Sequence, residues 1–235
     1  GTLTLMGPRS RELLQGLVAE DLSNEAFPFG RCRELTLAGR KVRALRVTFV
    51  GELGWELHMP IAATGDVYDA IMAAGAPFGI ANAGYRALET LRLEKGYRVW
   101  GAEITPSDSP FDAGLGWAVK LKTNLPFLGR EAAGAAATGP RPKRLACFTV
   151  DDPAVVLQGR ETIFRDGKPV GWLASAGWGY TVGKNIGYGY VRNAAGVDLD
   201  HLKSGSYALE VACEEVPCRL QLKTLYDPTM SRVKA

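Results

Sequence analysis

Two glutamates stand four residues apart in VGELGWELHMP, residues 50–60, and they are the first candidates for chemistry in this sequence. With the two-residue period of a β-strand, Glu52, Gly54 and Glu56 fall on one face together with His58. A carboxylate accepts two parallel hydrogen bonds from a planar donor pair, such as a guanidinium or the ring N–H and exocyclic amine of an aminopyrimidinone. Because Gly54 lets a flat ligand approach the backbone, this face is a candidate planar-ligand site. The opposite face is apolar and is expected to face the core: Leu53, Trp55, Leu57 and Met59.

A simpler interpretation of these acids is a solvated sheet face, on which they pair with Arg43 or Arg46. Arg86 lies on a predicted helix near residues 85–95, where neighbouring Glu89 also allows ordinary surface pairing at helical spacing. Trp117 follows glycines in GLGW, where an aromatic ring can stack on a planar ligand or fill an ordinary core position. The residues alone leave these alternatives open.

The elements that must position these residues form an α+β part followed by an all-β part. The first part is predicted to contain strands at 2–6, 32–37 and 41–49, a turn at Gly39, and helices near 9–18, 64–75 and 85–95. Thr64 is expected to cap the second helix and Gly75 to end it. Residues 101–120 form an irregular stretch of a length typical of functional loops. Beyond an Ala/Gly-rich linker, short strand patterns and dense glycines predict a barrel or sandwich.

Composition excludes several classes of function. The 235 residues carry a net charge of only +3 with interspersed signs, which does not indicate nucleic acid or an anionic membrane as partner. No apolar run reaches the roughly 20 residues of a membrane helix, and no signal peptide pattern opens the sequence. Two histidines and four scattered cysteines give no metal-ligand spacing, so no metal site is predicted. Dinucleotide fingerprints, P-loops and nucleophile elbows do not occur.

Five ordered stretches resemble one known family: RVTFVGELGWELHMP, AGYRALETLRLEKGYRVWGAEI, SPFDAGLGWAVKLK, PFLGREA and IGYGYV. Together they resemble the folate-binding aminomethyltransferase superfamily, which includes the glycine-cleavage T-protein. LRLEKGYRVWGAEITPSDSP and LKSGSYALE are most similar to the C-terminal region of sarcosine and dimethylglycine dehydrogenases. The resemblance implies a folate-binding α+β region at 1–133 that lacks its N-terminal part, a linker at 134–140 and a C-terminal β-barrel at 141–235.

The same resemblance implies a set of folate-binding residues. The pterin-binding carboxylate of the family falls on Glu56, its basic helix residue on Arg86 and its loop aromatic on Trp117. A tyrosine that often precedes the acidic motif is Phe49 here, which keeps the ring and loses the hydroxyl. Two neighbours of Glu56 are expected to line the same pocket: Leu57 and His58. The family's catalytic aspartate is expected upstream of this chain, so none of these residues is predicted to be catalytic.

The implied function is to bind tetrahydrofolate inside a flavin-dependent N-methyl amine dehydrogenase that forms 5,10-methylenetetrahydrofolate. FAD is expected in an upstream domain of the same polypeptide or in a partner subunit, and the chain by itself is expected to be inactive. Two alternatives remain: a T-protein-like aminomethyltransferase or other folate-dependent demethylase, and a non-catalytic regulatory subunit such as that of pyruvate dehydrogenase phosphatase. The expected location is the cytoplasm for a bacterial source and the mitochondrial matrix for a eukaryotic one.

Overall fold

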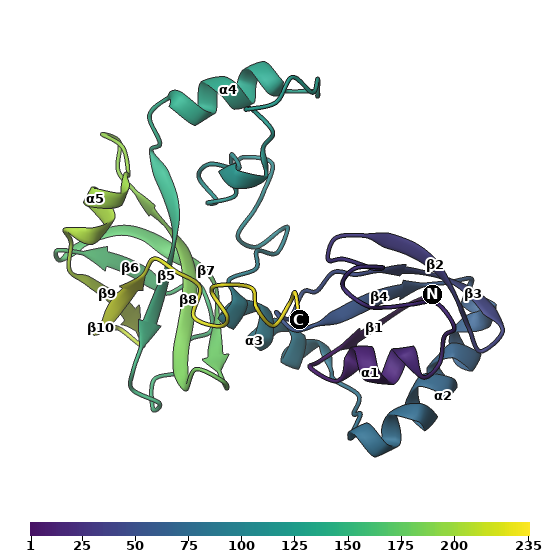
Figure 1. Ribbon diagram of the computed structural model, residues 1–235. Helices are drawn as coiled ribbons and strands as arrows, with labels where there is room; N and C mark the ends of the chain where they lie inside the picture. Colours follow the sequence, from purple (N-terminus) through teal and green to yellow (C-terminus); the bar gives the residue numbers. More distant parts are fainter. The chain divides into compact units, whose positions relative to one another are not determined.

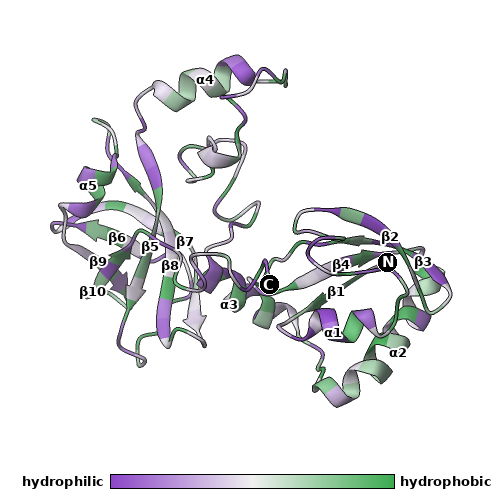
Figure 2. Ribbon diagram, viewed as in Figure 1, coloured by the Kyte–Doolittle hydropathy of each residue, from purple (hydrophilic) through white to green (hydrophobic).

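The computed structural model describes residues 1–235, which form two compact units. The first unit comprises residues 1–95 together with 226–235, and the barrel unit comprises residues 96–225 (Figure 1). Each unit has its own hydrophobic core. Hydrophobic and hydrophilic residues are both present in the strands of each unit (Figure 2).

An antiparallel four-stranded sheet organises the first unit, with the strand order β1-β4-β3-β2. Its strands are β1 (Thr2–Met6), β2 (Cys32–Leu37), β3 (Arg40–Leu45) and β4 (Gly54–His58). Its helices are α1 (Ser10–Gln15), η1 (Ile61–Ala63), α2 (Thr64–Gly75), η2 (Ala76–Phe78) and α3 (Tyr85–Lys95). The core lies between one face of the sheet and helices α1 and α2, which bury Leu14 and Val67 against Trp55 and its neighbours.

Strand parity predicted the faces of β4 correctly. Trp55 and Leu57 are fully buried, whereas Glu56 and His58 on the other face are only partly buried. The hairpin between β2 and β3 also follows the prediction, because Ala38 and Gly39 adopt the positive φ angles of +50° and +68° that a tight two-residue turn requires.

The second predicted helix has the expected bounds, Thr64–Gly75, but its ends differ from the predicted caps. Thr64 does not cap α2, because the chain already turns as η1 and the cap position falls on Ala63. Gly75 is the last residue of α2, as predicted, and the 3-10 turn η2 follows it to Phe78. The left-handed conformation of Gly79, at φ +72°, ends the segment.

The barrel unit is a closed six-stranded antiparallel barrel with the order β10-β5-β8-β7-β6-β9, which leaves no open sheet edge. Its strands are β5 (Lys143–Val150), β6 (Thr162–Arg165), β7 (Lys168–Gly179), β8 (Lys184–Arg192), β9 (Tyr207–Val211) and β10 (Glu214–Gln221). Its helices are η3 (Gly116–Ala118), α4 (Arg130–Thr138) and α5 (Leu199–Lys203). The α+β part followed by a barrel therefore confirms the predicted fold class.

Residues 96–120 cover the outside of the barrel. The amide of Leu145 donates to the Asp112 carbonyl at 2.8 Å, and the Tyr190 hydroxyl donates to the Glu103 carbonyl at 2.9 Å. The two compact units divide at 95/96, and α4 covers part of the predicted linker 134–140. None of the helices has the length and apolar character that crossing a membrane requires.

Candidate binding site on the first unit

Glu56 presents a carboxylate on the open face of the four-stranded sheet. Antiparallel pairing sets it between Thr4 of β1 and Leu45 of β3. Its Oε2 lies 3.4 Å from Nε2 of His58, whose Nδ1 lies 3.2 Å from the Thr2 hydroxyl. About one third of each of the Glu56 and His58 side chains is exposed, and no lysine or arginine pairs with Glu56. The carboxylate is therefore positioned as an acceptor with capacity for further donors.

Glu52 lies in a different environment, although the strand pattern placed it on the same face. Its Oε1 accepts a hydrogen bond from the Tyr226 hydroxyl and lies 3.8 Å from the guanidinium of Arg232. Burial and then this hydrogen bond raise the pKa of Tyr226 to about 12. Glu52 therefore anchors residues 226–235 to the first unit. The predicted alternative pairing with Arg46 does not form, since buried Arg46 donates to the carbonyls of Phe27 and Ala235.

Sequence reasoning did not find Tyr226, because its partner Glu52 is 174 residues away. The only local signal is its position before the Asp227-Pro228 turn, which does not indicate a partner. Asp227 itself pairs with Lys95 at 2.9 Å, and both side chains are almost completely buried. Burial opposes ionisation of Asp227, but hydrogen bonds from Ser231 and Lys95 outweigh it and lower its pKa to about 2.

The structure requires glycine at position 54 for a reason that differs from the predicted one. A Cβ at this position would lie 2.5 Å from the Leu5 carbonyl oxygen and closer still to the Met6 sulfur. The space beside the Gly54 backbone is thus occupied by β1 and does not receive a flat ligand. The glycine allows close pairing of β1 with β4.

The other predicted site residues occupy varied positions. Leu57 is fully buried in the core on the face of β4 opposite Glu56, so its side chain does not reach the open face and its place in the ligand pocket stays a prediction. Phe49 is half-buried in the segment that leads into β4, and Arg86 is exposed in the first turn of α3. Trp117 lies on η3 of the barrel unit with 81% of its surface exposed, which excludes the core alternative.

A cavity of about 500 Å³ lies beside β1 within the first unit. Its walls come from β1, from apolar side chains of α2 and α3, and from residues 80–83. Glu52 contributes the one carboxylate to this lining. Because β1 is an edge strand of the sheet, the cavity follows that edge, and Glu56 is not part of its lining.

Two family models together match most of the chain. The GCVT N-terminal domain matches residues 1–123, and the glycine cleavage T-protein C-terminal barrel domain matches residues 143–227.

Curated relatives and a solved structure are also similar to this chain. Mouse mitochondrial sarcosine dehydrogenase is 51% identical over 100% of this chain and 26% of its own length. Mouse mitochondrial dimethylglycine dehydrogenase is 38% identical over 81% of this chain and 22% of its own length. The crystal structure of the glycine cleavage system aminomethyltransferase T from Bartonella henselae superposes with a TM-score of 0.79 at 22% identity, covering 97% of this chain and 60% of that one. The chain thus spans about a quarter of the dehydrogenases that it matches.

Proposed function

The chain belongs to the glycine-cleavage T-protein family, and on this basis we propose that it is the tetrahydrofolate-binding region of a flavin-dependent N-methyl amine dehydrogenase. The similarity to sarcosine dehydrogenase along the whole chain supports this parent enzyme over other members of the family. The amine is sarcosine or dimethylglycine. The flavin belongs to an upstream domain or a partner subunit, and the location is the mitochondrial matrix for a eukaryotic source or the cytoplasm for a bacterial one.

The observation that carries the proposal is the accessible carboxylate of Glu56, which pairs with no lysine or arginine. The amino-pyrimidinone edge of a pterin offers two parallel donors to such a group. A hydrogen bond from a neutral donor to a charged acceptor stabilises the complex by about 1.5–3 kcal/mol. His58 lies 3.4 Å from Glu56 and helps to orient its carboxylate.

The remaining contacts are assigned by residue type. Arg86 is exposed and supplies a guanidinium to the folate, Phe49 supplies an aromatic surface, and Trp117 supplies an exposed indole for stacking. The one-carbon unit removed from the amine ends as 5,10-methylenetetrahydrofolate. The contribution of this chain is to bind and orient the folate, which raises the rate through proximity.

The test is a titration of tetrahydrofolate into the intact parent enzyme and its variants Glu56→Ala and Glu56→Gln. Both variants are expected to weaken binding roughly ten- to a hundredfold, because each removes the charged acceptor. Glu34→Gln is the matched control, since Glu34 lies on the same open sheet face and pairs only with Lys41. Unchanged affinity in both Glu56 variants would contradict the assignment.

The activity of the parent enzyme distinguishes the alternative functions. A parent that binds tetrahydrofolate and oxidises no N-methyl amine would indicate a T-protein-like aminomethyltransferase or another folate-dependent demethylase. A parent that does neither would indicate a regulatory subunit.

A further inference from the structure

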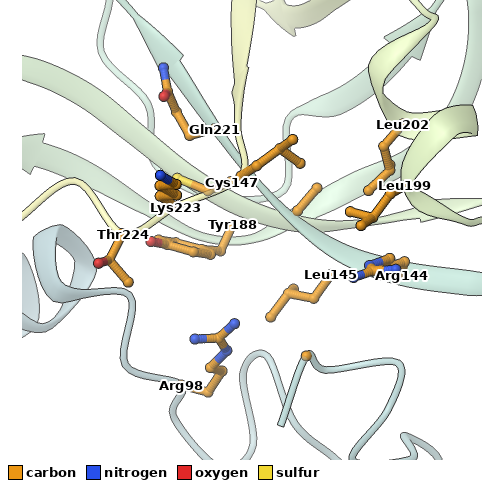
Figure 3. Close-up of a pocket in the computed structure, with 13 residues that line it drawn as sticks. Arg98, Arg144, Leu145, Cys147, Tyr188, Leu199, Leu202, Gln221, Lys223 and Thr224 are labelled. Atoms are coloured by element: carbon orange, nitrogen blue, oxygen red, sulfur yellow. The ribbon is translucent and has the colours of Figure 1, made fainter. Parts of the chain in front are cut away.

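A small pocket of about 180 Å³ opens on the outer surface of the barrel unit, where residues 96–114 cover strands β5 and β8 (Figure 3). Three cationic side chains reach it from different sides: Arg98 from the covering segment, Arg144 from β5 and Lys223 from the chain that leaves β10. No carboxylate lines the pocket. Three like charges around one small volume repel one another unless an anion lies between them.

Arg98 is held in a fixed position. Its Nε donates to the Ala113 carbonyl at 3.2 Å, and its Nη1 donates to the Gly96 carbonyl. Gly114 has a φ angle of +71°, and a Cβ there would lie 3.2 Å from Nη2 of Arg98, so the glycine backbone makes room for the guanidinium. With Nε and Nη1 bonded to the chain, Nη2 remains to donate to a ligand.

The partial burial of Arg144 is not balanced by a carboxylate in the pocket wall. Burial, followed by the neighbouring charge of Arg141, lowers the pKa of Arg144, and Asp198 offsets this only in part. The Asp198 carboxylate already accepts the amide of His201 at the start of α5, at 2.7 Å. The positive potential at this end of the pocket therefore remains available to an anion.

The other polar groups in the wall are neutral. Burial raises the pKa of the Cys147 thiol to about 12, so the sulfur stays protonated at neutral pH. Tyr188, Gln221 and Thr224 contribute a hydroxyl, an amide and a second hydroxyl. None of these groups is an anion that would compete with the ligand for the cations.

We propose that this pocket binds a small oxyanion, the carboxylate or phosphate group of a ligand, between Arg98, Arg144 and Lys223. Nη2 of Arg98 donates to an oxygen of such a group, and the Lys223 ammonium adds a mobile charge. The volume accommodates one anionic head group and not a whole nucleotide or folate. This inference concerns the barrel unit alone and does not depend on the proposed function of Glu56.

The test is isothermal titration calorimetry on the full 235-residue chain, with sodium phosphate and γ-glutamylglutamate as separate probes at low ionic strength. Both Arg144→Gln and Lys223→Gln are expected to weaken binding of the preferred probe about tenfold, because each removes one charge-assisted contact. Arg98→Gln is expected to abolish binding, although it also removes two bonds to the backbone. The other two variants therefore keep the test independent of local folding. Raising the salt concentration is expected to weaken binding further, as it does for accessible charges.

Lys168→Gln is the matched control, because Lys168 is an exposed lysine of the same unit outside the pocket. Tighter binding of phosphate assigns the site to phosphate-bearing ligands, and tighter binding of the dipeptide assigns it to carboxylates. The proposal is overturned if neither probe binds at millimolar concentration. It is also overturned if Arg144→Gln and Lys223→Gln change affinity no more than Lys168→Gln does.

Discussion

At the scale of single residues, two glutamates with the same strand parity have separate roles. Glu56 keeps an accessible carboxylate, whereas Glu52 is 18% exposed and engaged by Tyr226 and Arg232. The sequence predicted Glu56 as an accessible acid on the open face of β4, because side-chain direction in a strand is a local property. It could not predict the Tyr226 contact, which depends on how the chain returns after the barrel.

Replacing Tyr226 with phenylalanine tests the structural role of Glu52. The variant loses the donor to a partly buried carboxylate whose second oxygen is buried without a partner, so a loss of about 1.5–3 kcal/mol in unfolding free energy is expected. Tyr68→Phe is the control, because the Tyr68 hydroxyl accepts a bond from Asn82 at an exposed position. Urea denaturation of both variants measures the difference. Equal losses would show that the Glu52 contact contributes no more than a surface hydrogen bond.

At the scale of elements, short-range patterns determined most of the sheet of the first unit. The sequence predicted β1, β2 and α3 with the bounds that the structure shows, since each has its own period and its own stop signals. It failed where contact with another element decides the role of a residue. The need for a glycine at position 54 comes from the pairing of β1 with β4, which a local sequence pattern does not reveal. Leu57 belonged to the apolar face by parity, and only the family resemblance assigned it to the ligand.

Gly54→Ala is expected to destabilise the first unit by about 1–3 kcal/mol or more, because the new methyl group would overlap the backbone of Leu5 and the side chain of Met6. Backbone cannot move aside as a flexible side chain does, so the pairing of β1 with β4 must shift. Gly65→Ala is the opposite case: nothing lies within 4 Å of its Cβ, and the residue is helical in α2. That variant is expected to be neutral or stabilising by about 0.5–1 kcal/mol. Thermal unfolding of the two variants gives the comparison, and a harmless Gly54→Ala would show that the close approach is not required.

At the scale of the whole chain, the first unit is discontinuous. Residues 226–235 belong to it although the barrel occupies the intervening positions, and Lys95, Glu94 and Glu52 bind the returning segment at Asp227 and Tyr226. A boundary drawn from composition cannot detect such a return, because a ten-residue segment has no core of its own. The buried pair Lys95–Asp227 is the centre of this attachment.

Asp227→Asn tests the attachment through its pH dependence. Removing one partner of a buried pair leaves the Lys95 charge uncompensated, so a loss of about 3–5 kcal/mol in unfolding free energy is expected at pH 7. The folded pKa of Asp227, about 2, lies below the unfolded value near 4, so its contribution is present above pH 4 and is lost as the pH falls toward 2. The difference in unfolding free energy between wild type and variant, measured by urea denaturation, is therefore expected to shrink between pH 4 and pH 2.

The control is Asp66→Asn, which breaks the exposed pair with Arg40. It is expected to lower the unfolding free energy by at most about 1 kcal/mol, with no comparable acid dependence. A constant difference for Asp227→Asn from pH 7 to pH 2 would show that the ionised pair does not hold residues 226–235 on the first unit.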